Sequence, residues 1–324
     1  MMKKNGMMLA LAAGVLLAAS CGKTIDNPQP RKMDITLTAS ISNPETKTEY
    51  TDPGDGSLSV TWSDGDKMSL LVIKGDGEIV SNTVLENQSG AVKNAVFTGL
   101  IPELEAGQRY LCVYPALEGE LTDLKSNEGW LSYDASEKKL VYNPYNSDFH
   151  FFVRDRHGSW QKAFKEADLM IGVPEIDGGT ANVVLERQMG VLKLVVTVPA
   201  VFSGVAPDFC GLQKLSASDF VIEMSADLSA DVISFVNVYE GVSKAVSGGF
   251  ESAQDVSSGK MVVYLPLAPC TLTKGTVYVS LASFAQDIFR VAEIDNTTVD
   301  VEILAGKMTT LTIGSISTWF DPTS

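Results

Sequence analysis

Histidine, the side chain most often used for acid–base catalysis, occurs only as His150 and His157. Their spacing differs from the i, i+4 pair that a helical zinc site uses, and the sequence contains no HExxH motif. A G-x-S-x-G elbow and a phosphate-binding loop are also absent. Asp155 could orient His157 and so activate a nucleophile, but a loop of mixed charge is the interpretation we favour. We therefore expect no enzymatic activity.

Several aspartates stand in Gly-rich segments and could offer oxygen ligands to calcium. These residues are Asp52, Asp55, Asp64, Asp66 and Asp76. An EF-hand loop would add regularly spaced ligands and a glutamate at its twelfth position, and that pattern is missing. Because Asp-Gly is a strong signal for a hairpin turn, we predict turns here and expect no bound metal or cofactor.

The elements that carry these residues are predicted to be β-strands almost throughout. Ile35, Leu37, Ala39 and Ile41 alternate with polar residues, which is the period of a half-buried strand. The same alternation recurs at 58–62, where Trp62 falls on the buried face, and at 68–72. Further strands are expected at 95–97, 109–114, 183–185, 190–198, 232–239, 261–265, 276–282, 288–294, 299–304 and 308–313, and a short helix at 160–167.

Turn signals between these short strands indicate antiparallel β-sandwiches. The length suggests two domains, and the Asp177-Gly-Gly segment is the predicted boundary. We assign the N-terminal sandwich to residues 34–179 and the C-terminal sandwich to residues 180–324.

The first residues have the composition of an export signal. Lys3 and Lys4 precede an apolar run at 7–17, and small residues at 18–20 lead into Cys21. This pattern is typical of a secretory signal and is too short to span a bilayer. The Cys21 context resembles a bacterial lipobox, in which the thiol is acylated and begins the mature protein. We therefore expect a signal peptide at 1–20, lipidation of Cys21 and a flexible tether at 21–33.

The charge and the remaining cysteines limit the choice of partners. The formal net charge is −15, which argues against nucleic acid and anionic lipid headgroups as partners. Cys112, Cys210 and Cys270 form no CxxC pair, so a disulfide framework is not expected, although one bridge among them stays open. Cys112, between apolar neighbours, is expected to be a small buried hydrophobic residue.

The order of motifs along the chain resembles the fimbrillin-like lipoproteins of Bacteroidetes, the stalk, tip and anchor subunits of surface pili. The segments that carry the resemblance are Thr-Lys-Thr-Glu-Tyr from Thr46, Val-Thr-Trp-Ser-Asp-Gly-Asp-Lys-Met from Val60, Phe-Thr-Gly from Phe97, Tyr-Leu-Cys-Val-Tyr-Pro from Tyr110, 161–172, Leu-Glu-Arg-Gln-Met-Gly-Val-Leu-Lys-Leu from Leu185, Tyr-Leu-Pro from Tyr264, Leu-Ala-Gly-Lys from Leu304 and Ser-Thr-Trp from Ser317. The resemblance implies two tandem transthyretin-like β-sandwiches and assembly outside the cell.

It also implies a maturation step. In polymerising members of the family, a protease cuts after a basic residue and removes an N-terminal strand, and a neighbour's strand fills the groove. The segment at 34–42 has the alternation of such a strand. Lys47 occupies the family's basic position, and Arg31 is a second candidate. The family usually has arginine at the cut, so a lysine that only forms a turn remains an alternative.

Aromatic residues are concentrated between Trp130 and Trp160. Candidate contact residues for a ligand or partner are Trp130, Tyr133, Tyr142, Tyr145 and Trp160. Exposed rings stack on sugars or on partner strands, whereas buried rings would complete the core of the first domain. We favour the core interpretation and keep a monomeric glycan-binding lipoprotein as the alternative function.

Together these observations predict a lipid-anchored protein of the cell outer membrane or cell surface that acts as a fimbrial subunit or adhesin. The expected partners are other pilin subunits, in a homo- or heteropolymer, with host or glycan ligands as a further possibility. Contact with the membrane is expected through the lipid anchor only.

Overall fold

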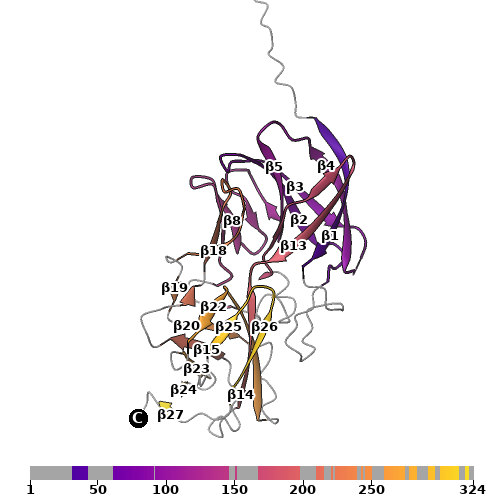
Figure 1. The fold of residues 1–324 in the computed structure, drawn as a ribbon. Coiled ribbons are helices and arrows are strands. Elements are labelled where there is room, and N and C mark those ends of the chain that lie inside the picture. The colour runs from indigo at the N-terminus through magenta and orange to yellow at the C-terminus, as the bar shows by residue number, and fades with distance from the viewer. Residues whose placement is uncertain are drawn as a thin grey trace, which may run out of the picture. The chain divides into compact units, whose positions relative to one another are not determined.

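The computed structural model describes residues 31–42, 61–90, 92–145, 150–151, 167–197, 209–214, 220–221, 223–238, 242–243, 245–249, 259–273, 277–282, 291–295, 300–313 and 318–320. These residues form an all-β fold, as the alternation predicts (Figure 1). Within these ranges, no helix has the length and apolar character required to cross a membrane. The finer assignment to tandem transthyretin-like sandwiches stays a prediction.

The largest sheet has eight strands in the order β1-β4-β3-β2-β5-β11-β13-β12. Its members are β1 (Lys32–Ile41), β2 (Lys67–Lys74), β3 (Ile79–Asn87), β4 (Asn94–Pro102), β5 (Gln108–Tyr114), β11 (Met170–Gly172), β12 (Glu175–Asp177) and β13 (Thr180–Arg187). Because β1 also pairs with β13, the sheet closes on itself.

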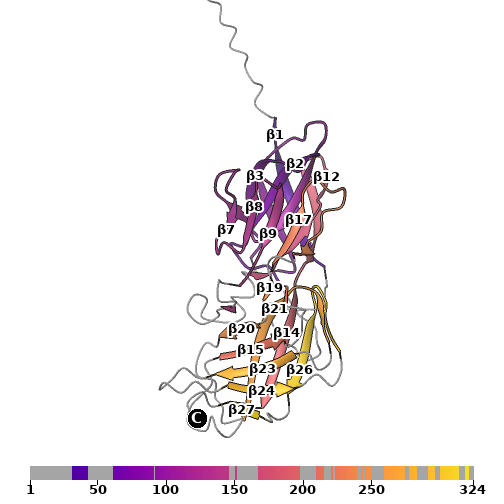
Figure 2. The ribbon, with the colours of Figure 1, turned by 90° about the vertical axis from the view of Figure 1, so that its left-hand side faces the viewer.

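A second sheet, in the order β18-β17-β9-β8-β7-β6, packs on the outside of this closed sheet. It contains β6 (Leu117–Glu118), β7 (Lys125–Ser126), β8 (Leu131–Asp134), β9 (Lys139–Tyr142), β17 (Met224–Asp227) and β18 (Val236–Asn237). Although β17 follows β9 by more than eighty residues, the two strands lie side by side from Met224↔Tyr142 to Asp227↔Lys139 (Figure 2). Arg109 of β5 donates hydrogen bonds to the carbonyls of Leu228 (2.8 Å) and Asp231 (3.0 Å), and so fastens the turn after β17.

Four further sheets contain the remaining described strands. One has the order β10-β20-β15-β23-β24-β27, and another the order β21-β14-β26. The bounds are β10 (His150–Phe151), β14 (Gly190–Thr197), β15 (Phe209–Lys214), β20 (Ala245–Gly249), β21 (Lys260–Leu267), β23 (Val277–Ala282), β24 (Val291–Asp295), β26 (Met308–Ile313) and β27 (Thr318–Phe320). Two-stranded sheets join β16 (Phe220–Val221) to β19 (Val242–Ser243) and β22 (Cys270–Leu272) to β25 (Val301–Ile303).

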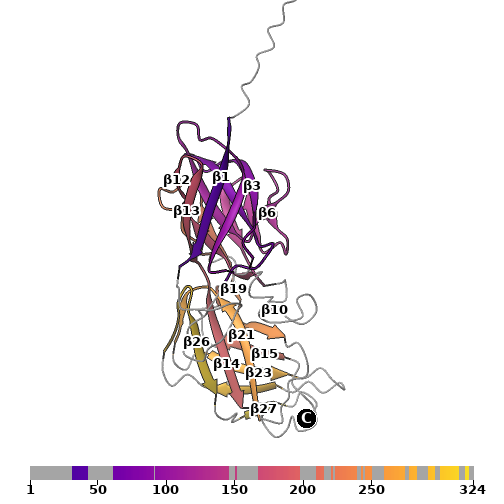
Figure 3. The same ribbon diagram turned by 90° about the vertical axis from the view of Figure 1, so that its right-hand side faces the viewer.

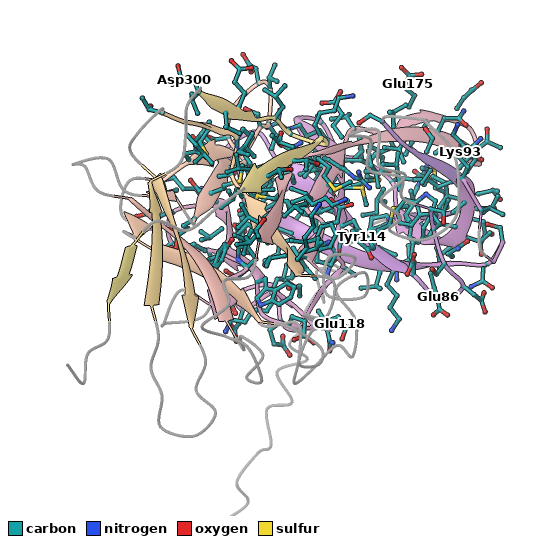
Figure 4. All side chains as sticks on the ribbon, turned by 90° about the horizontal axis from the view of Figure 1, so that it is seen from below. Glu86, Lys93, Tyr114, Glu118, Glu175 and Asp300 are labelled. Carbon is teal, nitrogen blue, oxygen red and sulfur yellow. The ribbon has the colours of Figure 1, made fainter. Side chains whose placement is uncertain are left out.

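The strand β5 connects the two hydrophobic cores of the N-terminal region, because both of its faces are buried. Tyr110, Cys112 and Tyr114 point into the closed sheet, and Leu111 and Val113 point toward the second sheet. The prediction that Cys112 is a buried hydrophobic residue is confirmed, and burial raises the pKa of its thiol to about 12. Tyr114 lies among the interior side chains in Figure 4, whereas the carboxylates of Glu86, Glu118 and Glu175 point outward.

One sequence prediction needs correction. The segment 232–239 is not one strand, because only Val236–Asn237 is extended and paired, and Val232 is exposed rather than packed on a core. The predicted strands at 183–185 and 190–198 correspond to β13 and β14, which belong to different sheets. The predicted boundary at Gly179 lies in the turn between β12 and β13 of one sheet. The chain passes to a different sheet after Arg187, and the division into two domains stays a prediction. Of the short helix at 160–167, residues 160–166 lie outside the described part.

Candidate functional site

The strand β1 is paired along both of its edges. It runs antiparallel to β4 from Lys32↔Pro102 to Ser40↔Asn94, and parallel to β13 from Thr36↔Thr180 to Ile41↔Leu185. Figure 3 shows β1 in indigo with β13 along one side. The backbone N–H of Thr36 donates to Gly179 O at 2.9 Å, which fixes the start of the parallel pairing. The strand is therefore the one that closes the eight-stranded sheet.

One face of β1 points into the closed sheet. Ile35, Leu37, Ala39 and Ile41 are buried, while the residues between them are exposed or half-buried. Full burial of one such aliphatic side chain contributes roughly 1.5–3 kcal/mol. The predicted strand at 34–42 is confirmed, shifted by one or two residues at its ends. Removal of β1 would leave an apolar groove between the unpaired edges of β4 and β13.

Trp62 lies under the groove and holds β1 directly. Its indole Nε1–H donates to Ala39 O at 3.2 Å, and the side chain is 1% exposed. The ring meets Phe97 and Tyr114 edge-to-face, with centroid distances of 5.1 Å and 5.5 Å. A backbone bridge to Val92 fixes its main chain. The prediction that Trp62 lies on the buried face is confirmed.

The β13 wall of the groove is held on its other side by a buried ion pair. The Nε of Arg187 lies 2.9 Å from Oδ2 of Asp168, and the two side chains are only 2% and 6% exposed. Gly172 of β11 also allows close approach to β13, because an added Cβ would lie 2.4 Å from the backbone oxygen of Val184. These contacts hold β13 independently of β1, because none of them involves a residue of that strand.

The outward face of β1 borders a surface cavity of about 690 Å³. Thr38 and Ser40 line it together with Asn182 and Val184 of β13. The segment 232–234 supplies another wall. Polar side chains thus alternate along β1 with the apolar ones that point into the interior.

Some of the residues predicted to act at the site fall outside the described part of the chain. Cys21, Lys47, His157, Asp155 and Trp160 lie there, as do Asp52 and Asp55. His150 lies in β10, which pairs in parallel with β20. Arg31 is exposed and directly precedes Lys32, the first residue of β1.

The aromatic candidates in the described part are mostly core residues. Tyr133, Tyr142 and Tyr145 are buried, so the core interpretation applies to these three rings and the exposed-patch alternative does not. The hydroxyl of Tyr142 donates to Ala167 O, and that of Tyr145 donates to Pro266 O at 2.5 Å. Burial raises the pKa of both phenols. Trp130 is half-buried and packs against the core cluster that contains Tyr133 and Tyr142.

In the described part of the chain, two of the aspartates considered as calcium ligands accept hydrogen bonds from other protein groups. Oδ2 of Asp66 accepts a hydrogen bond from Ser63 N at 2.6 Å, and Oδ2 of Asp76 accepts one from Lys138 Nζ at 2.6 Å. The Lys138 bond lowers the pKa of Asp76. Among the described residues, no group of three or more His, Cys, Asp or Glu side chains is arranged to hold a metal ion.

No protein-family model matches the sequence, and no curated protein matches it either. Among solved structures, a "putative cell adhesion protein" from Bacteroides uniformis ATCC 8492 has a similar fold. It has a TM-score of 0.50 and 12% identity, over 90% of this chain and 99% of that one.

Two further structures give lower scores. One bears the same description and comes from Bacteroides ovatus ATCC 8483, with a TM-score of 0.47, 11% identity, and coverage of 90% of this chain and 97% of that one. The other is the tip fimbrial protein Mfa3 from Porphyromonas gingivalis, with a TM-score of 0.37, 12% identity, and coverage of 85% and 82%. At 12% identity, the similarity to the Bacteroides uniformis structure shows a shared fold alone.

Proposed function

We propose that this chain is a surface lipoprotein, anchored through Cys21, that acts as a fimbrial subunit or adhesin and assembles by strand donation. The observation that carries the proposal is the position of β1, which closes the sheet with both edges paired and an apolar face buried. A strand from a neighbouring subunit that takes its place would regain the same backbone hydrogen bonds and fill the same pockets.

The two candidate cleavage points have opposite consequences for the groove. A cut after Arg31 leaves β1 intact, because Lys32 is its first residue. A cut after Lys47 separates the whole of β1 from the rest of the chain, because the strand ends at Ile41. We therefore propose that cleavage after Lys47 opens the groove, whereas cleavage after Arg31 only releases the protein from its lipid anchor.

Cleavage by itself is not expected to empty the groove. The buried side chains of β1 and its two ladders of hydrogen bonds still favour the bound strand after the backbone is cut. Departure of β1 becomes favourable when an incoming strand replaces these contacts one pair at a time. Assembly is thus an exchange of one strand for another.

Limited trypsin treatment of the full chain tests the proposal, with Lys47→Gln and Arg31→Gln as matched variants. The wild type and Arg31→Gln are expected to form polymers whose subunits begin at Thr48, whereas Lys47→Gln stays monomeric. Mass spectrometry of the N-terminus and light scattering of the same sample give the two readouts. Polymers that retain residues 32–47, or equal assembly by Lys47→Gln, would contradict the proposal.

A further inference from the structure

The groove under β1 does not have the same depth along its length. Ile35 faces Gly99 of β4, which has no side chain of its own, and Leu37 faces the ring of Phe97. Ala39 faces Ala95, so at this position both strands carry a single methyl group. Of the four β1 residues that point into the closed sheet, the third, Ala39, is therefore the small one. It lies between the larger residues Leu37 and Ile41.

Trp62 explains why this position is small. The indole donates its N–H to the carbonyl of Ala39, which places the ring against the backbone at that residue. Phe97 and Tyr114 meet the indole edge-to-face, and the backbone bridge to Val92 fixes the main chain of Trp62. On the other side of β1, Ala39 is paired with Val183 of β13. A larger side chain at position 39 would need the volume that these buried groups occupy, and dense packing gives little room for adjustment.

The first inward position shows the opposite arrangement. An added Cβ at Gly99 would lie 2.5 Å from Cδ2 of Leu85, so Leu85 fills the space that a side chain of β4 would need there. Ile35, the β1 residue paired with Gly99, is large and buried. The groove therefore accepts a large residue at positions 35 and 37, and a small one at 39.

We infer that the groove selects its partner strand by size at the Trp62 position. This inference rests on the proposed strand donation. The partner is a strand of a neighbouring subunit that runs antiparallel to β4 and parallel to β13. It carries large apolar residues where β1 has Ile35, Leu37 and Ile41, and alanine, glycine or serine where β1 has Ala39. A strand with large residues at all four inward positions is excluded.

Peptide competition tests the selection. Wild-type chain cleaved after Lys47 is loaded with a fluorescent peptide of residues 32–42, and unlabelled competitors are followed by anisotropy. The competitors are the native peptide, the Ala39→Leu peptide and the Thr36→Leu peptide, which places the same leucine side chain on the exposed face. The native and Thr36→Leu peptides are expected to compete within about threefold of each other, and Ala39→Leu about tenfold or more weakly.

The outcomes separate the inference from the proposed function. Equal competition by Ala39→Leu and Thr36→Leu overturns the size selection and leaves strand exchange standing. Failure of the native peptide to enter the groove, even with excess peptide and long incubation, overturns strand exchange, and the selection with it. Weak competition by both variants shows that bulk anywhere on the strand interferes, which also overturns selection at the Trp62 position.

Discussion

Replacing Asp168 with asparagine is expected to lower the free energy of unfolding by about 3–5 kcal/mol. The guanidinium of Arg187 is almost fully buried and lies 2.9 Å from the Asp168 carboxylate. A neutral amide removes the carboxylate charge beside this buried guanidinium, and the cost of breaking a buried pair is much larger than the net value of the pair itself. Urea unfolding followed by circular dichroism measures the change.

A surface pair in the same protein provides the control. Lys125 and Asp123 lie 2.7 Å apart, but their side chains are 56% and 71% exposed. Asp123→Asn is therefore expected to change stability by less than about 1 kcal/mol. The double variant Asp168→Asn with Arg187→Met should recover part of the loss, because the buried positive charge is removed as well. If Asp168→Asn unfolds at the same urea concentration as Asp123→Asn, the ion pair does not hold β13 in the way described above.

The second large effect is expected for Trp62→Ala, at about 3–5 kcal/mol of unfolding free energy. The substitution removes a buried indole, leaves a cavity between Phe97 and Tyr114, and deletes the hydrogen bond to Ala39. Because that bond reaches β1 directly, hydrogen exchange at the amides of β1 should accelerate more than exchange at β2. The same urea titration and exchange mass spectrometry supply both readouts.

Trp130→Ala is the matched control, since Trp130 is half-buried and packs against the other core cluster. It should cost clearly less stability than Trp62→Ala and should leave exchange in β1 unchanged. An equal loss for both variants, or a Trp62→Ala protein with normal exchange in β1, would mean that Trp62 does not fasten the closing strand.

The fold class could be predicted from the sequence because the alternation reports which side of each strand is buried. At β1, Ile35, Leu37, Ala39 and Ile41 all lie on one face because only that face meets the core. The prediction of a strand at 232–239 is wrong for the same physical reason. An apolar residue such as Val232 indicates a strand only when its side chain packs against a core, and Val232 is exposed. Alternation along a segment contains no information about the partner surface.

The site was predictable only in part. The alternation identified β1 and the buried face of Trp62, but no local pattern shows that β13 pairs with β1 across about 140 residues. The ion pair between Asp168 and Arg187 was missed because each residue, alone in the sequence, is typical of a solvated loop or strand end. Only weak features of the sequence indicate this buried pair. Asp168 directly precedes the apolar residues 169–171, and Arg187 ends a strongly alternating strand.

Hydrogen exchange on assembled polymers tests the central claim, that a strand from a neighbouring subunit occupies the place of β1. The sample is the trypsin-generated polymer in which residues 1–47 are absent, compared with the uncut monomer. Amides in β4 and at 180–185 of β13, the two edges that β1 covers, are expected to be as strongly protected in the polymer as in the monomer. An intact polymer in which these two segments exchange at the rate of unpaired strands would contradict it, because the subunits would then be joined elsewhere.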